Sequence, residues 1–154
     1  LSKTKQRDAR KPFSFICSVL SDAATYAHVS NFAFKIMKRH LPGPYTFVLE
    51  ATRIVPDSLT TRQKTVGIRI PDDEIAMAIV RELGHPLVTT SANLTGETPL
   101  HDPQEIDAIM GKQLVIVVDG GRRYGDPSTV ISLIGDRVEV LREGCGDTSW
   151  IDQL

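Results

Sequence analysis

The stretch Thr65-Val-Gly-Ile-Arg-Ile-Pro71, together with the residues that follow it up to Gly84, decides the fold of this chain. Its apolar residues alternate with polar or small ones, namely Val66, Ile68 and Ile70 against Thr65, Gly67 and Arg69. This period of two predicts a strand with one apolar and one polar face. The Pro-Asp-Asp sequence that comes next predicts the start of a helix over residues 74–83, which Gly84 ends.

Working outward, the same patterns predict further elements on both sides of this stretch. We expect strands over residues 13–20, 45–51, 86–90, 114–119, 129–133 and 137–142. We expect helices from about Asp22, from near Ser30 to Pro42, and from Asp102-Pro103. Strands 13–20 and 114–119 read as buried, and the last two strands as a hairpin that turns near Gly135-Asp136. This order of elements predicts a twisted open α/β sheet with parallel and antiparallel pairs, flanked by helices, in a single domain over residues 1–154.

Length and composition limit the class of protein. The 154 residues are 41% hydrophobic and 24% charged, which is typical of one globular domain without a membrane span. Cys17 and Cys145 lack metal-site spacing, so we expect a reducing, cytoplasmic environment. The net charge is −1, yet five cations crowd the first eleven residues: Lys3, Lys5, Arg7, Arg10 and Lys11. A solvated basic tail is one interpretation of this cluster and a phosphate-binding segment is the other.

Familiar catalytic and nucleotide-binding motifs are absent from the sequence. It contains no G-x-x-x-x-G-K-[ST] loop, no G-x-G-x-x-G turn and no G-x-S-x-G elbow. The four histidines, His28, His40, His85 and His101, show no paired spacing. We therefore expect no protein-bound metal site and no side-chain nucleophile.

Polar residues at strand ends remain as candidates for a binding site. Thr89, Ser91 and Asn93 fall on one side of the chain if it stays extended, where their hydroxyl and amide groups can bind a phosphate, ribose or carboxylate. Local turn capping is the alternative role for these three residues. Arg69 and Arg142 lie on or at the end of predicted strands and need anionic partners, which are either a ligand or an Asp or Glu of the chain.

Six segments in the same order resemble the YrdC-like superfamily, the threonylcarbamoyl-AMP synthase family. They are Lys5-Gln-Arg7 with Lys11-Pro12-Phe13, Pro42-Gly-Pro-Tyr-Thr-Phe-Val48, Thr65-Val-Gly-Ile-Arg-Ile-Pro71, Thr90-Ser-Ala-Asn93, Pro127-Ser-Thr-Val-Ile131 and Val140-Leu-Arg-Glu-Gly144. The Lys-Pro-Phe-Ser-Phe stretch and the Arg-Glu-Gly-Cys-Gly-Asp ending are most similar to the YciO branch. The family's N-terminal strand and its Pro-Thr-x-Thr segment have no counterpart, so we expect this sequence to lack the first part of the domain.

The resemblance implies a nucleotidyltransferase that makes threonylcarbamoyl-AMP and pyrophosphate from ATP, L-threonine and bicarbonate, a step in tRNA t6A modification. It implies ATP contacts by Lys5, Arg7, Thr65, Ser91, Asn93 and Arg142, and threonine contacts by Arg69, Thr89 and Ser128. Magnesium would enter with ATP, bound mainly by the triphosphate.

Two alternatives to this activity stay open. One is a module that binds tRNA or double-stranded RNA, since the basic N-terminal cluster suits phosphate contacts. The other is a regulatory relative that binds nucleotide without turning it over.

Overall fold

The computed structural model describes residues 13–94, 97–123 and 125–154. Its contacts divide the chain into two compact units. The larger unit comprises residues 9–89 and 126–154, and the smaller unit comprises residues 1–8 and 90–125. No helix in the described ranges is both long and apolar enough to cross a bilayer.

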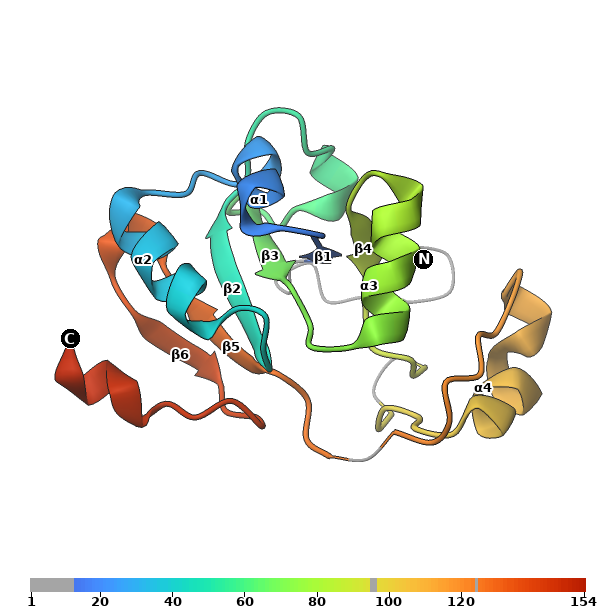
Figure 1. Cartoon of the computed structure of the whole chain (residues 1–154). Helices are drawn as coiled ribbons and strands as arrows, with labels where there is room; N and C mark the ends of the chain where they lie inside the picture. Colours follow the sequence, from blue (N-terminus) through green and yellow to red (C-terminus); the bar gives the residue numbers. More distant parts are fainter. Residues whose placement is uncertain (1–12, 95–96, 124) are drawn as a thin grey trace. The chain divides into compact units, whose positions relative to one another are not determined.

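The larger unit is built on a six-stranded sheet with the order β4-β1-β3-β2-β5-β6 (Figure 1). The strands are β1 (Ser14–Ile16), β2 (Tyr45–Glu50), β3 (Thr65–Arg69), β4 (Leu87–Thr89), β5 (Thr129–Ser132) and β6 (Glu139–Arg142). β1 runs parallel to β3 and β2 parallel to β5, whereas the other three neighbouring pairs are antiparallel. The predicted open sheet of mixed direction is therefore confirmed. The expected hairpin is also present, because β5 and β6 are joined through the short helix η3 (Ile134–Asp136).

Three helices of this unit begin and end close to where local signals place them. They are α1 (Leu20–Tyr26), α2 (Asn31–His40) and α3 (Glu74–Leu83). The Ser30 hydroxyl caps α2 by accepting a hydrogen bond from the Ala33 amide at 3.0 Å, and Asp73 caps α3 through the Ala76 amide at 2.8 Å. Gly84 ends α3 in the left-handed region with φ of 69°. The remaining 3-10 turns of the unit are η1 (Asp57–Leu59) and η4 (Ser149–Gln153).

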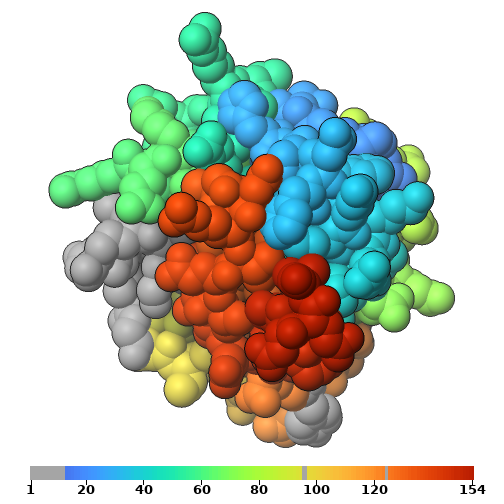
Figure 2. Space-filling view, turned by 90° about the vertical axis from the view of Figure 1, so that its left-hand side faces the viewer, coloured from blue at the N-terminus to red at the C-terminus, as the bar shows by residue number. Residues whose placement is uncertain are grey.

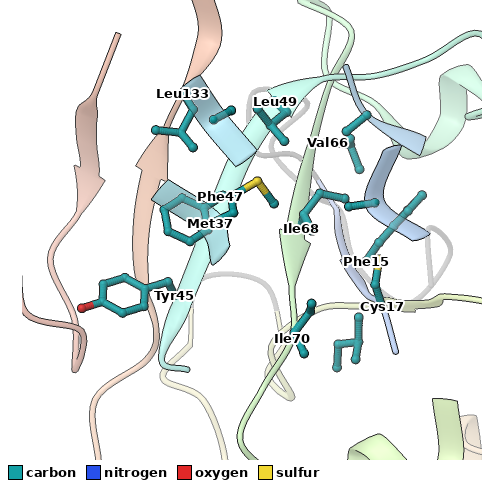
Figure 3. Packing of buried hydrophobic residues seen from close by; sticks show 14 of the residues in the cluster. Phe15, Cys17, Met37, Tyr45, Phe47, Leu49, Val66, Ile68, Ile70 and Leu133 are labelled. Carbon is teal, nitrogen blue, oxygen red and sulfur yellow. The ribbon is translucent and has the colours of Figure 1, made fainter. Parts of the chain in front are cut away.

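One face of the sheet and the helices over it form the hydrophobic core (Figure 3). Phe47 and Ile68, from the central strands, are fully buried beside Met37 of α2. Alternation along each strand places these side chains on the same face of the sheet, and α3 contributes Met77 and Val80 to the same cluster. Burial of this apolar surface is the main favourable term in folding.

The opposite face of the sheet carries most of the small and polar side chains of the strands, and we call it the polar face. It includes Ser14, Thr46, Gly67, Arg69 and Thr89, with Ser128 and Arg142 at one end, and the register also places the apolar Ile16, Val48 and Val130 on it. A Cβ atom on Gly67 would lie 2.9 Å from the Thr46 methyl group and 3.0 Å from the Ser14 hydroxyl, so only glycine fits between the flanking strands.

The first strand is shorter than the sequence pattern suggests. β1 ends at Ile16, Leu20 already belongs to α1, and Val19 is 51% exposed, so the prediction of one buried strand over residues 13–20 is wrong in its second half. The neighbours of β1 set this limit, because its pairing with β3 and β4 covers only residues 14–16. Cys17 follows β1 and is completely buried.

The smaller unit contains α4 (Pro103–Met110) and the turn η2 (Gly111–Gln113). Asp102 caps α4 by accepting a hydrogen bond from the Gln104 amide at 2.8 Å, as predicted. The predicted buried strand over residues 114–119 is wrong. This segment joins no ladder of the described residues, and Val115 is 104% exposed. An apolar β-type sequence forms a strand only where a neighbouring strand meets its backbone groups, and no such neighbour lies within the described part of the chain.

Candidate anion-binding site

Arg69 lies at the end of β3 and projects from the polar face of the sheet. Its Nε atom is buried and has no hydrogen-bond partner among the described residues. Burial lowers the pKa of Arg69, and the nearby charge of Arg142 lowers this pKa further. Within the described residues Arg69 forms no ion pair with a carboxylate. A half-buried guanidinium without a counter-ion costs free energy, which an anionic ligand would recover.

A second guanidinium, that of Arg142, lies at the same end of the sheet on β6. The β5–β6 ladder pairs Arg142 with Val130, next to the start of β5. Arg142 donates from Nη2 to the Ser128 carbonyl oxygen at 2.6 Å and from Nε to the same oxygen at 3.2 Å. Nη2 also approaches the Ser128 hydroxyl at 3.3 Å. These contacts fix the orientation of the guanidinium but leave its charge unneutralised.

The buried hydroxyls of Ser128 and Thr46 link the end of β6 that carries Arg142 to β2 in the middle of the sheet. Ser128 Oγ and Thr46 Oγ1 lie 2.9 Å apart, and both residues are less than 10% exposed. Sequence reasoning did not select Thr46, although it lies between Tyr45 and Phe47 in a strand that the sequence predicts. Its partner Ser128 lies 82 positions away, so only the tertiary structure reveals the contact.

The loop that follows β6 is held against the same region by Thr129. Its hydroxyl accepts hydrogen bonds from the Gly144 and Gly146 amides at 3.1 and 2.9 Å and donates to the Gly146 carbonyl oxygen at 2.7 Å. Farther along, Tyr45 Oη and Trp150 Nε1 both donate to the Asp147 carbonyl oxygen, at 2.9 and 2.8 Å. In the view of Figure 2, the C-terminal residues pack beside α2 and beside the last two strands, β5 and β6. These hydrogen bonds hold the loop after β6 beside the start of β5.

Arg69 and Arg142 together give this end of the polar face an uncompensated positive charge. The sequence left open whether carboxylates of the chain neutralise them, and in the described residues none does so. Two guanidiniums beside buried hydroxyls suit a carboxylate or a phosphate, whose oxygens accept charge-assisted hydrogen bonds. We therefore assign this end of the face as a candidate anion-binding site.

Thr89 and Thr65 were also predicted to contact ligands, and the structure places them differently. Thr89 pairs with Ser14 on the polar face, where its hydroxyl donates to the Ser14 carbonyl oxygen at 3.1 Å. Thr65 lies at the far end of β3, about 13 Å from Arg69 at the usual rise per residue. Its hydroxyl is buried and lies 2.8 Å from that of Thr61. The larger unit thus brings Arg69, Ser128 and Arg142 together. Thr89 and Thr65 lie on the same face, but Thr65 is at its far end.

Comparison with known proteins identifies the family. A family model described as "Telomere recombination", which covers the Sua5, YciO and YrdC proteins, matches residues 1–144. The chain belongs to the Sua5/YciO/YrdC family. This result agrees with the resemblance seen in the sequence.

Several members of the Sua5/YciO/YrdC family are similar over most of the chain. YciO of Escherichia coli is 42% identical over 137 residues, covering 88% of this chain and 66% of YciO. A putative threonylcarbamoyl-AMP synthase of Methanocaldococcus jannaschii is 37% identical over 142 residues, covering 91% of this chain and 66% of the relative. The chain thus spans just under two thirds of the length of these two relatives.

Solved structures of the family share the fold. The crystal structure of E. coli YciO matches with a TM-score of 0.89 at 39% identity, over 96% of this chain and 72% of YciO. That of P. abyssi Sua5 complexed with L-threonine matches with a TM-score of 0.89 at 28% identity, over 98% of this chain and 45% of Sua5. Members of this family thus include proteins named as threonylcarbamoyl-AMP synthases and one crystallised with threonine.

Four further residues predicted for a Sua5/YciO/YrdC site lie outside the larger unit. Ser91 and Asn93 belong to the smaller unit, where the Ser91 hydroxyl donates to Asn93 Oδ1 at 2.7 Å. The chain bends at Ala92 and Asn93, so the extended conformation that would align Thr89, Ser91 and Asn93 is not adopted. Lys5 and Arg7 lie outside the described residues. The structure describes no group of three or more His, Cys, Asp or Glu residues that could hold a metal ion.

Proposed function

We propose that this chain binds the carboxylate of L-threonine through Arg69 and takes part in making threonylcarbamoyl-AMP from ATP, L-threonine and bicarbonate. The observation that carries the proposal is the pair Arg69 and Arg142, which face the same end of the sheet without a carboxylate partner among the described residues. The family supports this choice of ligand, because one relative was crystallised with threonine and others are named as the synthase.

In this proposal the residues bind and orient the reactants, and none forms a covalent bond with them. Bicarbonate and the threonine amine give a carbamate and water. An oxygen of the carbamate then attacks the α-phosphorus of ATP while the bond to pyrophosphate breaks, and pyrophosphate leaves. Positioning supplies much of the acceleration, and fixed cations stabilise the charge on the departing pyrophosphate. Arg142, held by the Ser128 carbonyl oxygen, is one such cation, and Lys5 and Arg7 are the others.

The remaining predicted residues are proposed contacts of the two ligands. Thr89 and Ser128 would contact threonine beside Arg69, whereas Thr65, Ser91 and Asn93 would contact ATP. Mg²⁺ would arrive with the triphosphate and be bound mainly by its oxygens. The chain spans just under two thirds of the matched YciO, so turnover is proposed for the longest form of the protein.

The test is calorimetric titration of L-threonine and ATP, separately and together, into the longest available form, with product mass measured. Arg69→Ala should weaken threonine binding about 10- to 100-fold, the loss expected when a charge-assisted hydrogen bond is removed. Arg137→Ala is the matched control, because Arg137 is exposed beside the β5–β6 turn. Unchanged threonine affinity in Arg69→Ala would refute the assignment, and joint binding without product would indicate a non-catalytic relative.

A further inference from the structure

β6 contains one residue more than its pairing with β5 requires. The ladder pairs Val140 with Ile131, which is fully buried in the core. The next pair joins Arg142 to Val130, so Leu141 has no partner of its own and forms a β-bulge. The irregularity therefore lies directly before the arginine of the anion-binding site.

This bulge decides which face of the sheet carries Arg142. Residues two apart on a regular strand point to the same face, so without the bulge Arg142 would point, like Val140, to the core face. With the bulge, Arg142 lies opposite Val130, and the pairing of β2 with β5 places Val130 beside Thr46 on the polar face. β-Bulges often redirect a side chain in this way next to a binding site. Arg142 thus reaches the site through a local irregularity of β6.

Thr129 fastens the chain just after the bulge. Its side chain is fully buried, and its hydroxyl accepts hydrogen bonds from the Gly144 amide at 3.1 Å and from the Gly146 amide at 2.9 Å. Between these two, the Cys145 amide donates to the Pro127 carbonyl oxygen at 3.0 Å. Three consecutive amides are thus bound at the start of β5, and one buried hydroxyl holds two of them.

The fastened loop and the arginine hold to neighbouring residues. A Cβ atom on Gly144 would clash with the Pro127 carbonyl oxygen, so only glycine lets the loop approach β5 this closely. The Arg142 guanidinium donates to the carbonyl oxygen of Ser128, the residue before Thr129. Straightening the bulge would move the chain on both sides of it and break these bonds.

We propose that Thr129 is a positioning residue, which maintains the bulge of β6 and so keeps Arg142 on the polar face for an anionic ligand. Thr129 itself touches no ligand in this arrangement and acts through the backbone of Gly144 and Gly146. The choice of the ATP triphosphate as the ligand rests on the proposed function.

The test compares Thr129→Val, which removes the hydroxyl at similar size, with Thr129→Ser, which keeps it. The Nε–H resonance of Arg142, identified by its loss in Arg142→Ala, reports the hydrogen bond to the Ser128 carbonyl oxygen. In the longest available form of the protein, we expect this proton to exchange with water about tenfold faster in Thr129→Val and at the unmodified rate in Thr129→Ser. Thr52→Val is the matched control, since it removes a hydroxyl hydrogen bond to the Thr25 carbonyl oxygen and should leave the exchange unchanged.

Calorimetric titration of ATP gives a second, independent reading. Arg142→Ala and Thr129→Val should each weaken ATP binding about tenfold, and Thr129→Ser should restore it. The double variant of Arg142→Ala and Thr129→Val should bind ATP no more weakly than Arg142→Ala alone, because both changes remove the same contact. Losses that simply add would mean that Thr129 does not act through Arg142, and would overturn the proposal.

Unchanged exchange of the Arg142 Nε proton in Thr129→Val would also overturn the proposal. If Thr129→Val fails to fold, Gly144→Ala replaces it, because this change displaces the same loop and leaves the hydroxyl in place. Faster exchange together with equal ATP affinity in Arg142→Ala and the unmodified protein would give a different result. It would refute the part that Arg142 plays in the proposed function and support the positioning role of Thr129.

Discussion

Burial, with a smaller contribution from the nearby Asp22 carboxylate, raises the pKa of the Cys17 thiol to about 12, whereas Cys145 is exposed. Only the thiolate is nucleophilic, so Cys17 is unreactive in the folded protein. We expect the native protein to react rapidly with Ellman's reagent at one thiol, and the guanidinium-unfolded protein at two. Cys145→Ser should abolish the rapid native reaction. Two rapidly reacting thiols in the native protein would contradict the burial of Cys17.

The second residue-scale prediction concerns His40, whose imidazole stacks on Trp150 with ring centroids 4.2 Å apart. Its Nε2 atom is buried without a partner. Burial lowers the pKa of His40 below its usual 6.5, and Arg39 lowers it further, against an opposing effect of Asp147. Below pH 6.5, His40 therefore binds a proton more readily in the unfolded chain than in the folded chain. As a result, the free energy of unfolding falls as the pH decreases from 6.5 toward the pKa of His40 in the folded state.

Urea unfolding at pH 8 and at pH 5 measures this dependence. His40→Phe keeps an aromatic ring against Trp150 but removes the titrating group. We expect the free energy of unfolding of the unmodified protein to fall more between the two pH values than that of His40→Phe. An equal fall in both proteins would show that His40 does not contribute to the acid sensitivity.

At the scale of elements, sequence reasoning succeeded where the signal was local. α3 begins and ends at the predicted residues, because Asp73 caps its first turn and Gly84 supplies a left-handed residue at its end. Residues 114–119 have an equally clear β-type sequence, yet they form no strand within the described ranges. A helix satisfies its hydrogen bonds within itself, whereas a strand depends on a neighbour that is often far away in sequence.

The end of α3 gives a prediction at this scale. Gly84 has φ of 69°, and no atom lies within 4 Å of the position that a Cβ would occupy. Gly84→Ala therefore introduces backbone strain without a steric clash, and we expect it to lower the free energy of unfolding by about 1 kcal/mol. Gly84→Asn should cost less, since asparagine tolerates the left-handed region. Urea denaturation of the three proteins measures both changes, and equal stability of all three would contradict the assigned cap.

At the scale of the whole molecule, the two faces of the sheet of the larger unit carry different side chains. One face packs on α2 and α3 through Phe47 and Ile68, while the other carries Arg69 and the buried hydroxyls. The period of two along residues 65–71 predicted this division. The contacts of Arg142 with Ser128, and of Ser128 with Thr46, join strands that are distant in sequence, so no local pattern could predict them.

RNA binding, the alternative suggested by the basic N-terminal cluster, can be distinguished from threonine binding by its dependence on salt. If Lys3, Arg10 and Lys11 contact phosphates, replacing all three with alanine should reduce the slope of log K for tRNA against log salt by up to about 3, roughly 0.9 for each contact. Arg69→Ala should leave that slope unchanged while weakening threonine binding.

The matched control replaces three exposed cations of α2, Lys35, Lys38 and Arg39, and changes the net charge equally. Filter binding of tRNA at several salt concentrations compares these proteins. An equal loss of slope in both triple variants would mean that overall charge, and not the N-terminal cluster, attracts RNA. Phosphate contacts release counterions, so RNA binding through them must depend on salt. A slope near zero in the unmodified protein would therefore exclude RNA binding through phosphate contacts, and the anion-binding site would remain as the candidate functional surface.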